Sequence, residues 1–163
     1  MSIYFEDIEV DIVQHLGAHT FNREEIIAFA RDFDPQRFHL DEEAAAAGLF
    51  GSLSASGWHT ASIWLRLVID SRKRQADQMR FRGERPALWG PSPGFEAVKW
   101  LKPVLVNDTI SYTARFAEKR DSRSRPNVGL VYSANEGINQ KGEMVFAVTS
   151  KMFVERRNPI VHA

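Results

Sequence analysis

Apolar and polar positions follow two different rhythms along the chain, and these divide it into a helical part and a strand-rich part. In residues 22–74, apolar side chains recur at the three- and four-residue spacing of helices. In residues 94–157, short runs rich in Val, Phe, Thr and Tyr are separated by turn residues, a pattern typical of strands. The pattern therefore predicts an α+β protein, in which helices pack against a sheet.

Two short helices are predicted from their boundary residues. The first begins after Asn22, with Glu25 at the spacing of a capping box. It should end near residue 33, because Pro35 disfavours helical backbone at the residue before it. The second begins after Asp41, which can cap it, and stops at Gly48.

A third, longer helix is predicted over about residues 57–74, with Ser54 or Ser56 as its cap. Its apolar residues lie on most sides rather than in one stripe, which is typical of a buried helix. Its last turn contains Arg72 and two further basic residues, which suit the negative end of a helix dipole. Residues 75–93, which contain several Gly and Pro, are expected to be irregular.

Five strands complete the expected inventory, at residues 14–21, 95–100, 109–119, 129–136 and 143–154. About five mainly antiparallel strands wrapped around one long central helix form the hot-dog architecture. The sequence contains no internal repeat and no linker rich in Gly, Ser or Pro. We therefore expect one hot-dog domain over residues 1–163.

Composition narrows the range of functions. The chain has 163 residues with 21 basic and 21 acidic side chains, so it has no global field to attract nucleic acid or an anionic membrane. Cysteine is absent, which excludes a disulfide scaffold and a thiol nucleophile. The N-terminus lacks the pattern of a signal peptide, and Arg66 and Asp70 interrupt the longest apolar stretches. The expected location is cytoplasmic, with no nucleic-acid or membrane partner.

Chemistry is concentrated around the start of the long helix. Asp34 and His39 stand five residues apart on a predicted loop, and a carboxylate and an imidazole that converge can hold and deprotonate a water molecule. Gly57 opens the helix, where unpaired backbone N–H groups can receive an oxyanion. The spacing also occurs by chance, so these residues alone leave a structural role open. Asp41 could join the pair as a metal ligand, but nothing completes a coordination shell and no metal is expected.

The segment DPQRFH at residues 34–39 resembles the D-x-N-P-x-H hallmark of the MaoC-like dehydratases, a family that includes the (R)-specific enoyl-CoA hydratases. The spacing onward to Gly57 matches as well, and the resemblance continues through residues 55–60, 100–104 and 122–126. It thus covers nearly the whole chain. Gln36 replaces the hallmark Asn, Arg37 replaces the hallmark Pro, and Asn107 replaces a usual Gly.

This resemblance implies a reaction and roles for the residues. The reaction is the reversible syn addition of water to a trans-2-enoyl-CoA, which gives the (R)-3-hydroxyacyl-CoA without a metal or organic cofactor. Asp34 would be the main base, His39 would hold the same water, and the Gly57 N–H would receive the thioester oxygen. Asp32 is a rival carboxylate, but its spacing to His39 does not fit the family.

The resemblance also implies partners. The substrate would be an acyl-CoA thioester, and two copies would pair edge to edge as a homodimer. Four further residues are candidate substrate contacts: Arg37, Ser56, Arg123 and Arg125. Two other functions remain open at this point, a hot-dog acyl-CoA thioesterase and a non-catalytic acyl-CoA-binding subunit. The four tryptophans are expected in the core.

Overall fold

The computed structural model describes residues 4–122 and 124–160. Its centre is a sheet of five strands in the order β1-β3-β4-β5-β2, with every neighbouring pair antiparallel. The strands are β1 (Val13–Thr20), β2 (Phe95–Trp100), β3 (Thr109–Asp121), β4 (Val128–Asn139) and β5 (Met144–Glu155). Buried and half-buried residues alternate along all of β4, as expected for a strand with one face on the core.

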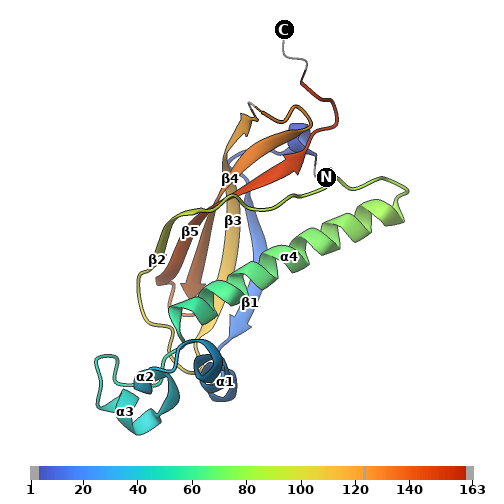
Figure 1. The fold of residues 1–163 in the computed structure, drawn as a ribbon. Helices are drawn as coiled ribbons and strands as arrows, with labels where there is room; N and C mark the ends of the chain where they lie inside the picture. The colour runs from blue at the N-terminus through green and yellow to red at the C-terminus, as the bar shows by residue number, and fades with distance from the viewer. Residues whose placement is uncertain (1–3, 123, 161–163) are drawn as a thin grey trace.

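One long helix, α4 (Gly57–Phe81), crosses a single face of the sheet (Figure 1). The short helices α1 (Arg23–Phe33), α2 (Arg37–Leu40) and α3 (Glu42–Ala46) gather at the end of the sheet where α4 begins, and the turn η1 (Phe5–Asp7) lies at the opposite end. The main core lies between α4 and the sheet, where Trp64 and Val68 join a cluster with Tyr112 and Phe146. This is the predicted hot-dog arrangement.

Two features of α4 differ from the prediction. The helix runs to Phe81 rather than ending near residue 74. Residues 75–80 are mostly good helix formers, and Met79 is buried against Ala87, which fixes the extra turns to the chain that follows. The helix is also exposed on one side, where Leu65 and Ile69 are 46% and 49% exposed.

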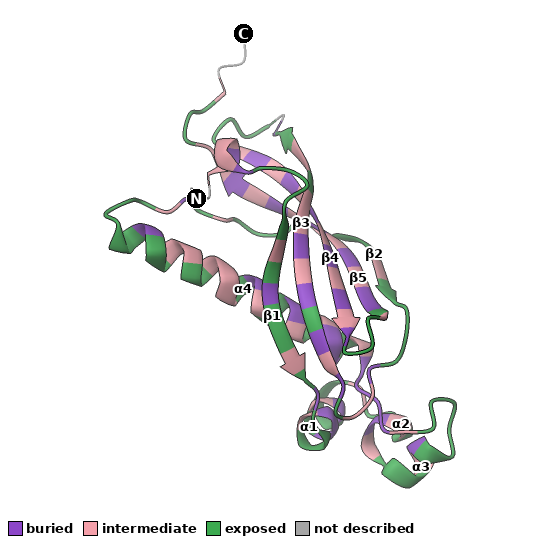
Figure 2. Cartoon of the chain, turned by 180° about the vertical axis from the view of Figure 1, so that it is seen from behind, coloured by how far each residue is buried: buried purple, intermediate pink, exposed green. Residues whose placement is uncertain are grey.

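The edges of the sheet are its most exposed parts, as seen from the face opposite α4 (Figure 2). Most residues of β1 and nearly all of β2 are exposed or half-buried, whereas β3, β4 and β5 alternate with buried residues. An edge strand presents unpaired backbone N–H and C=O groups. Among the described residues, no helix is long and apolar enough to cross a bilayer.

Candidate active site

The turn between α1 and α2 positions the predicted pair. Asn22 and Glu25 form the expected capping box at the start of α1. At the other end, the N–H of Asp34 donates to the Ala30 carbonyl, and the chain then turns at Pro35. His39 lies in α2, a one-turn helix within the predicted loop, and its side chain is buried. Asp34 and His39 are therefore brought together by a short and well-bonded turn.

Two hydrogen bonds hold the Asp34 carboxylate, and His39 lies beside it. The Ser56 hydroxyl donates to Oδ2 over 2.6 Å, and the Gln36 side-chain amide donates to Oδ1 over 2.8 Å. His39 Nε2 lies 3.4 Å from Oδ2. The other ring nitrogen, Nδ1, lies 2.6 Å from the Ser54 carbonyl, which can only accept, so Nδ1 carries a proton. Nε2 faces the Asp34 carboxylate, where it can donate to that carboxylate in the protonated ring or accept from a water in the neutral ring.

This environment favours the ionised form of Asp34. Burial raises the pKa of its carboxyl, but the hydrogen bonds from Ser56 and Gln36 and the nearby His39 lower it more, and the net pKa is below the usual value. Asp34 is therefore a carboxylate at neutral pH and can accept a proton from a bound water. Gln36, which departs from the hallmark Asn, retains the amide that donates to this carboxylate.

The start of α4 is connected to the same carboxylate. Ser56 caps the helix by accepting from the Trp58 N–H over 3.2 Å, while its hydroxyl donates to Asp34. Among the described residues, none accepts a hydrogen bond from the Gly57 N–H. This donor belongs to the positive end of a 25-residue helix, so it is suited to an oxygen that gains negative charge.

Glycine is required at position 57 for a reason that the sequence did not indicate. The Trp100 indole N–H donates to the Gly57 carbonyl over 2.7 Å. A Cβ atom at position 57 would lie 2.6–2.8 Å from three atoms of that ring, closer than packing allows. The expected close neighbour of Gly57 was a ligand; the structure places an indole ring there. Trp58 packs edge-on against the same ring.

A cavity of about 450 Å³ opens at these groups. Asp34, His39, Ser56 and Gly57 all line it, together with apolar side chains that include Phe38, Phe50, Trp58, Trp100 and Val104. A few converging polar groups within mostly apolar walls are typical of a small-molecule site. The cavity can hold an apolar chain and present one carbonyl to Gly57 and one water to Asp34.

Two of the three predicted arginine contacts, Arg37 and Arg125, lie outside this cavity. The side chain of Arg37 is 84% exposed and stands 4.0 Å from Asp41. Arg125 lies in the β3–β4 turn, at the opposite end of the sheet, where its guanidinium covers the Phe153 ring. Arg123 lies outside the described residues. Their role in substrate binding stays a prediction.

The rival carboxylates have other surroundings. Asp32 is exposed and does not line the cavity. Asp41 caps α3 by accepting from the N–H groups of Glu43 and Ala44. Within residues 4–122 and 124–160, no group of three or more His, Cys, Asp or Glu side chains is placed to hold a metal ion.

Sequence reasoning missed the contributions of Gln36, Ser54 and Trp100. The sequence could have indicated the role of Gln36, because an amide at the hallmark Asn position can still donate to Asp34. The sequence did not indicate the Ser54 contact, because every residue has a backbone acceptor. It did not indicate the Trp100 contact either, because Trp100 was expected in the core. Trp58 and Trp100 are in fact 60% and 44% exposed.

Comparisons with known proteins agree with this fold. A family model described as "MaoC like domain" matches residues 8–137, and the chain belongs to that family. A MaoC-like dehydratase from Rhodospirillum rubrum is 34% identical, with a TM-score of 0.78 over 98% of this chain and 100% of that one. A structure described as a monoamine oxidase regulatory protein from Archaeoglobus fulgius is 28% identical, with a TM-score of 0.75 over 95% of each chain. A 3-hydroxybutyryl-CoA dehydratase from Methylorubrum extorquens is 25% identical and covers 91% of this chain and 86% of its own length.

Proposed function

We propose that this protein is an acyl-CoA hydratase/dehydratase that adds water reversibly to a trans-2-enoyl-CoA and gives the (R)-3-hydroxyacyl-CoA. The observation that carries the proposal is the pairing of an ionised Asp34 with His39 Nε2, 3.4 Å away, on the wall of a cavity that also reaches the start of α4. The name of the Methylorubrum extorquens relative, a 3-hydroxybutyryl-CoA dehydratase, supports the same substrate class and reaction.

The Gly57 N–H accounts for activation of the substrate. The thioester carbonyl accepts a hydrogen bond from this donor at the start of α4. Negative charge moves onto the carbonyl oxygen as the nucleophile attacks C3 of the conjugated double bond, so a donor aimed at that oxygen lowers the barrier. Trp100 holds the Gly57 carbonyl over 2.7 Å and thus fixes the orientation of this first peptide unit of the helix.

The Asp34–His39 pair accounts for activation of the water. Asp34 removes one proton as the water oxygen bonds to C3, and the Asp34–His39 pair returns this proton to C2 on the same face, which makes the addition syn and leaves the pair in its starting state. The number of protons balances: one leaves the water and one enters C2. His39 holds the water through Nε2 while Ser54 fixes the ring through Nδ1. Dehydration follows the same steps in reverse.

A second copy of this chain is the proposed partner, paired at the β2 edge. Next to that edge, an apolar groove of about 130 Å³ runs between α4 and β2 and is lined by Leu65, Phe95 and Val98 among others. Phe95 is 51% exposed and Leu101 is 48% exposed. A two-fold pairing would extend the sheet, satisfy the exposed edge and cover these side chains at once.

The experiment is a panel of trans-2-enoyl-CoA thioesters from short to medium chain length. Loss of the enoyl absorbance and release of free thiol are measured in the same sample, and the chirality of the product is determined. Hydration without thiol release, with the (R) product, supports the proposal. Thiol release indicates a thioesterase, and binding without either change indicates a non-catalytic acyl-CoA-binding subunit.

A further inference from the structure

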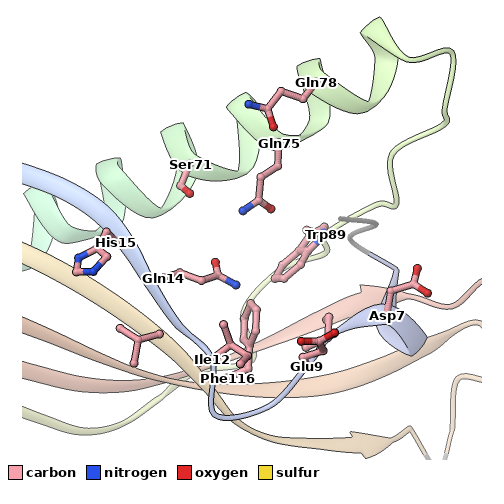
Figure 3. A pocket seen from close by; sticks show the side chains of 12 residues that line it. Asp7, Glu9, Ile12, Gln14, His15, Ser71, Gln75, Gln78, Trp89 and Phe116 are labelled. Atoms are coloured by element: carbon pink, nitrogen blue, oxygen red, sulfur yellow. The ribbon is translucent and has the colours of Figure 1, made fainter.

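A second cavity, of about 340 Å³, lies beside the C-terminal half of α4, away from the Asp34 site (Figure 3). Gln75 reaches from α4 toward the strand that carries Gln14, and the Trp89 ring stands beside them with Phe116 close by. The walls thus combine three side-chain amides, of Gln14, Gln75 and Gln78, with the aromatic rings of Trp89 and Phe116. Such a lining suits an organic molecule with an apolar body.

A smaller pocket, of about 30 Å³, continues this cavity toward the sheet. The two share five lining residues, which are Gln14, Ser71, Gln75, Trp89 and Phe116. The inner pocket is also lined by Arg72, Ser133 and Asn135. It has room for a group about the size of one or two water molecules. The pair of cavities therefore has a wide amphipathic outer part and a narrow inner part that ends at an arginine.

Arg72 is a largely buried cation without an anionic partner among the described residues. Its Nη2 lies 2.7 Å from the Met152 sulfur, and its guanidinium lies 4.5 Å from the centre of the Trp89 ring. Burial lowers the pKa of Arg72 to about 10, so the group is still charged at neutral pH. A thioether is a weak acceptor for a group with five N–H donors, and a buried charge is costly unless it is paired.

The polar neighbours in the inner pocket do not supply the missing charge. The Asn135 amide is already used, because it donates to the Ser133 and Val148 carbonyls and to the Ser150 hydroxyl. Two acidic residues, Asp7 and Glu9, also line the outer cavity, and Asp7 is paired with Arg157. Glu9 still places a negative charge at this wall, which disfavours a ligand with several negative charges, so the fitting ligand carries only one.

We propose that the two cavities together form a binding site for an organic monocarboxylate, whose carboxylate pairs with Arg72 and whose apolar body lies against Trp89 and Phe116. A guanidinium and a carboxylate match in charge and can form two parallel hydrogen bonds. Arg72 follows Gly57 by fifteen residues on α4, which separates the two sites by roughly 22 Å along the helix. The second site is therefore independent of the proposed hydration chemistry.

The test uses 3-phenylpropionate as the probe and 3-phenylpropanamide as its neutral isostere, with binding to the whole protein measured by calorimetry. The wild-type protein should bind the carboxylate with a Kd below about 1 mM and the amide at least about tenfold more weakly. Arg72→Met should weaken carboxylate binding about tenfold or more. Lys73→Met, at the neighbouring exposed position, should leave it unchanged.

Thermal unfolding of the same samples separates binding from folding. The carboxylate should raise the Tm of the wild type and of Lys73→Met but not that of Arg72→Met. Equal affinity of the wild type for the acid and the amide would overturn the proposal, and so would an absence of saturable binding up to about 10 mM. The comparison of acid and amide needs no variant, so the proposal remains testable if Arg72→Met fails to fold. Inorganic phosphate, which carries more charge, should bind more weakly than the carboxylate.

Discussion

The charged group beside the start of α4 and the charged group in its second half differ in how many partners the protein gives them. At its start, the Asp34 carboxylate receives hydrogen bonds from Ser56 and Gln36 and lies against His39. In its second half, the Arg72 guanidinium meets only a thioether and an aromatic ring among the described residues. The protein therefore supplies hydrogen bonds to the Asp34 carboxylate, whereas several N–H donors of Arg72 have no strong acceptor among the described residues.

This difference fits the two proposed roles, a catalytic base for Asp34 and a ligand-binding cation for Arg72. A base must be ionised before substrate arrives, so its partners have to be built into the fold, and the pKa of Asp34 is lowered accordingly. A cation that recognises a ligand gains from leaving its donors open, because the ligand then supplies the missing charge. The same helix thus begins beside the proposed base and carries the proposed binding group, Arg72, further along.

The largest effect is expected from Gly57→Pro, which removes the proposed oxyanion donor. The loss of one such donor costs about 3 kcal/mol of transition-state stabilisation, somewhat over a hundredfold in kcat. Proline is tolerated in the first turn of a helix, and Ser56 already has the extended backbone that precedes it well, so the fold should survive. Circular dichroism checks the fold, and hydration of a trans-2-enoyl-CoA measures the loss.

Gly57→Ala is the matched control, because it adds the clash with Trp100 but keeps the N–H. In a Trp100→Leu background, which removes the ring, adding Gly57→Ala should keep most of the activity of the Trp100→Leu single variant and adding Gly57→Pro should not. Equal recovery of both variants would mean that crowding, rather than loss of the donor, explains the effect.

The next effect concerns assembly at the β2 edge. Leu65→Lys places a charge in the apolar groove between α4 and β2, so it should convert the proposed homodimer to a monomer. Arg66→Ala, at the next position, removes only an exposed ion pair with Asp70 and should remain dimeric. Sedimentation velocity at micromolar concentration distinguishes the two. A wild-type protein that sediments as a monomer would remove the basis for the comparison.

A smaller effect is expected from Ser56→Ala. The variant loses a hydrogen bond that stabilises the charged carboxylate, so the pKa of Asp34 should rise. The same bond orients Asp34, so kcat should fall about tenfold. The helix also loses its cap, which should cost about 1 kcal/mol of unfolding free energy. Carbon NMR of the side-chain carboxyls gives the pKa directly. Ser62→Ala, whose hydroxyl donates only to the Trp58 carbonyl, should leave that pKa in place; if both variants shift it equally, the role of Ser56 is wrong.

The smallest effect on hydration is expected from Arg72→Met. The substitution is far from the Asp34 site, so kcat and KM for the enoyl thioester should remain within about twofold of the wild type. Its folded state loses a buried unpaired charge, so its Tm should not fall. A large loss of hydration activity would show that the two sites along α4 are coupled, and would contradict their proposed independence.

Local rules predicted much of this fold. The capping box of α1, the cap of α3 and the start of α4 were predicted because side-chain caps act within a few residues. The end of α4 was misplaced because three basic residues are typical of a last turn, whereas the burial of Met79 against Ala87 depends on chain that returns from further on. One-turn helix α2 was missed because it is shorter than any periodic signal.

The sequence predicted which residues line the candidate site better than it predicted the contacts those residues make. The spacing of Asp34, His39 and Gly57 is visible in the sequence, and the structure places all three on one cavity. The Trp100 ring over Gly57 brings together segments 43 residues apart, and no local pattern encodes such a contact. The exposure of Arg37 likewise depends on how α2 faces the cavity, which a sequence alone does not determine.

The central claim is that Asp34 is the base that activates the water, and the most direct measurement compares Asp34→Asn with Asp32→Asn. Both variants replace one carboxylate by its isosteric amide, two residues apart, and only Asp34 lines the cavity. Enoyl-CoA hydration is followed under identical conditions for the wild type and both variants. We predict that Asp34→Asn lowers kcat about a hundredfold or more while Asp32→Asn stays within about twofold. Near wild-type turnover by Asp34→Asn, or a loss confined to Asp32→Asn, would contradict the account.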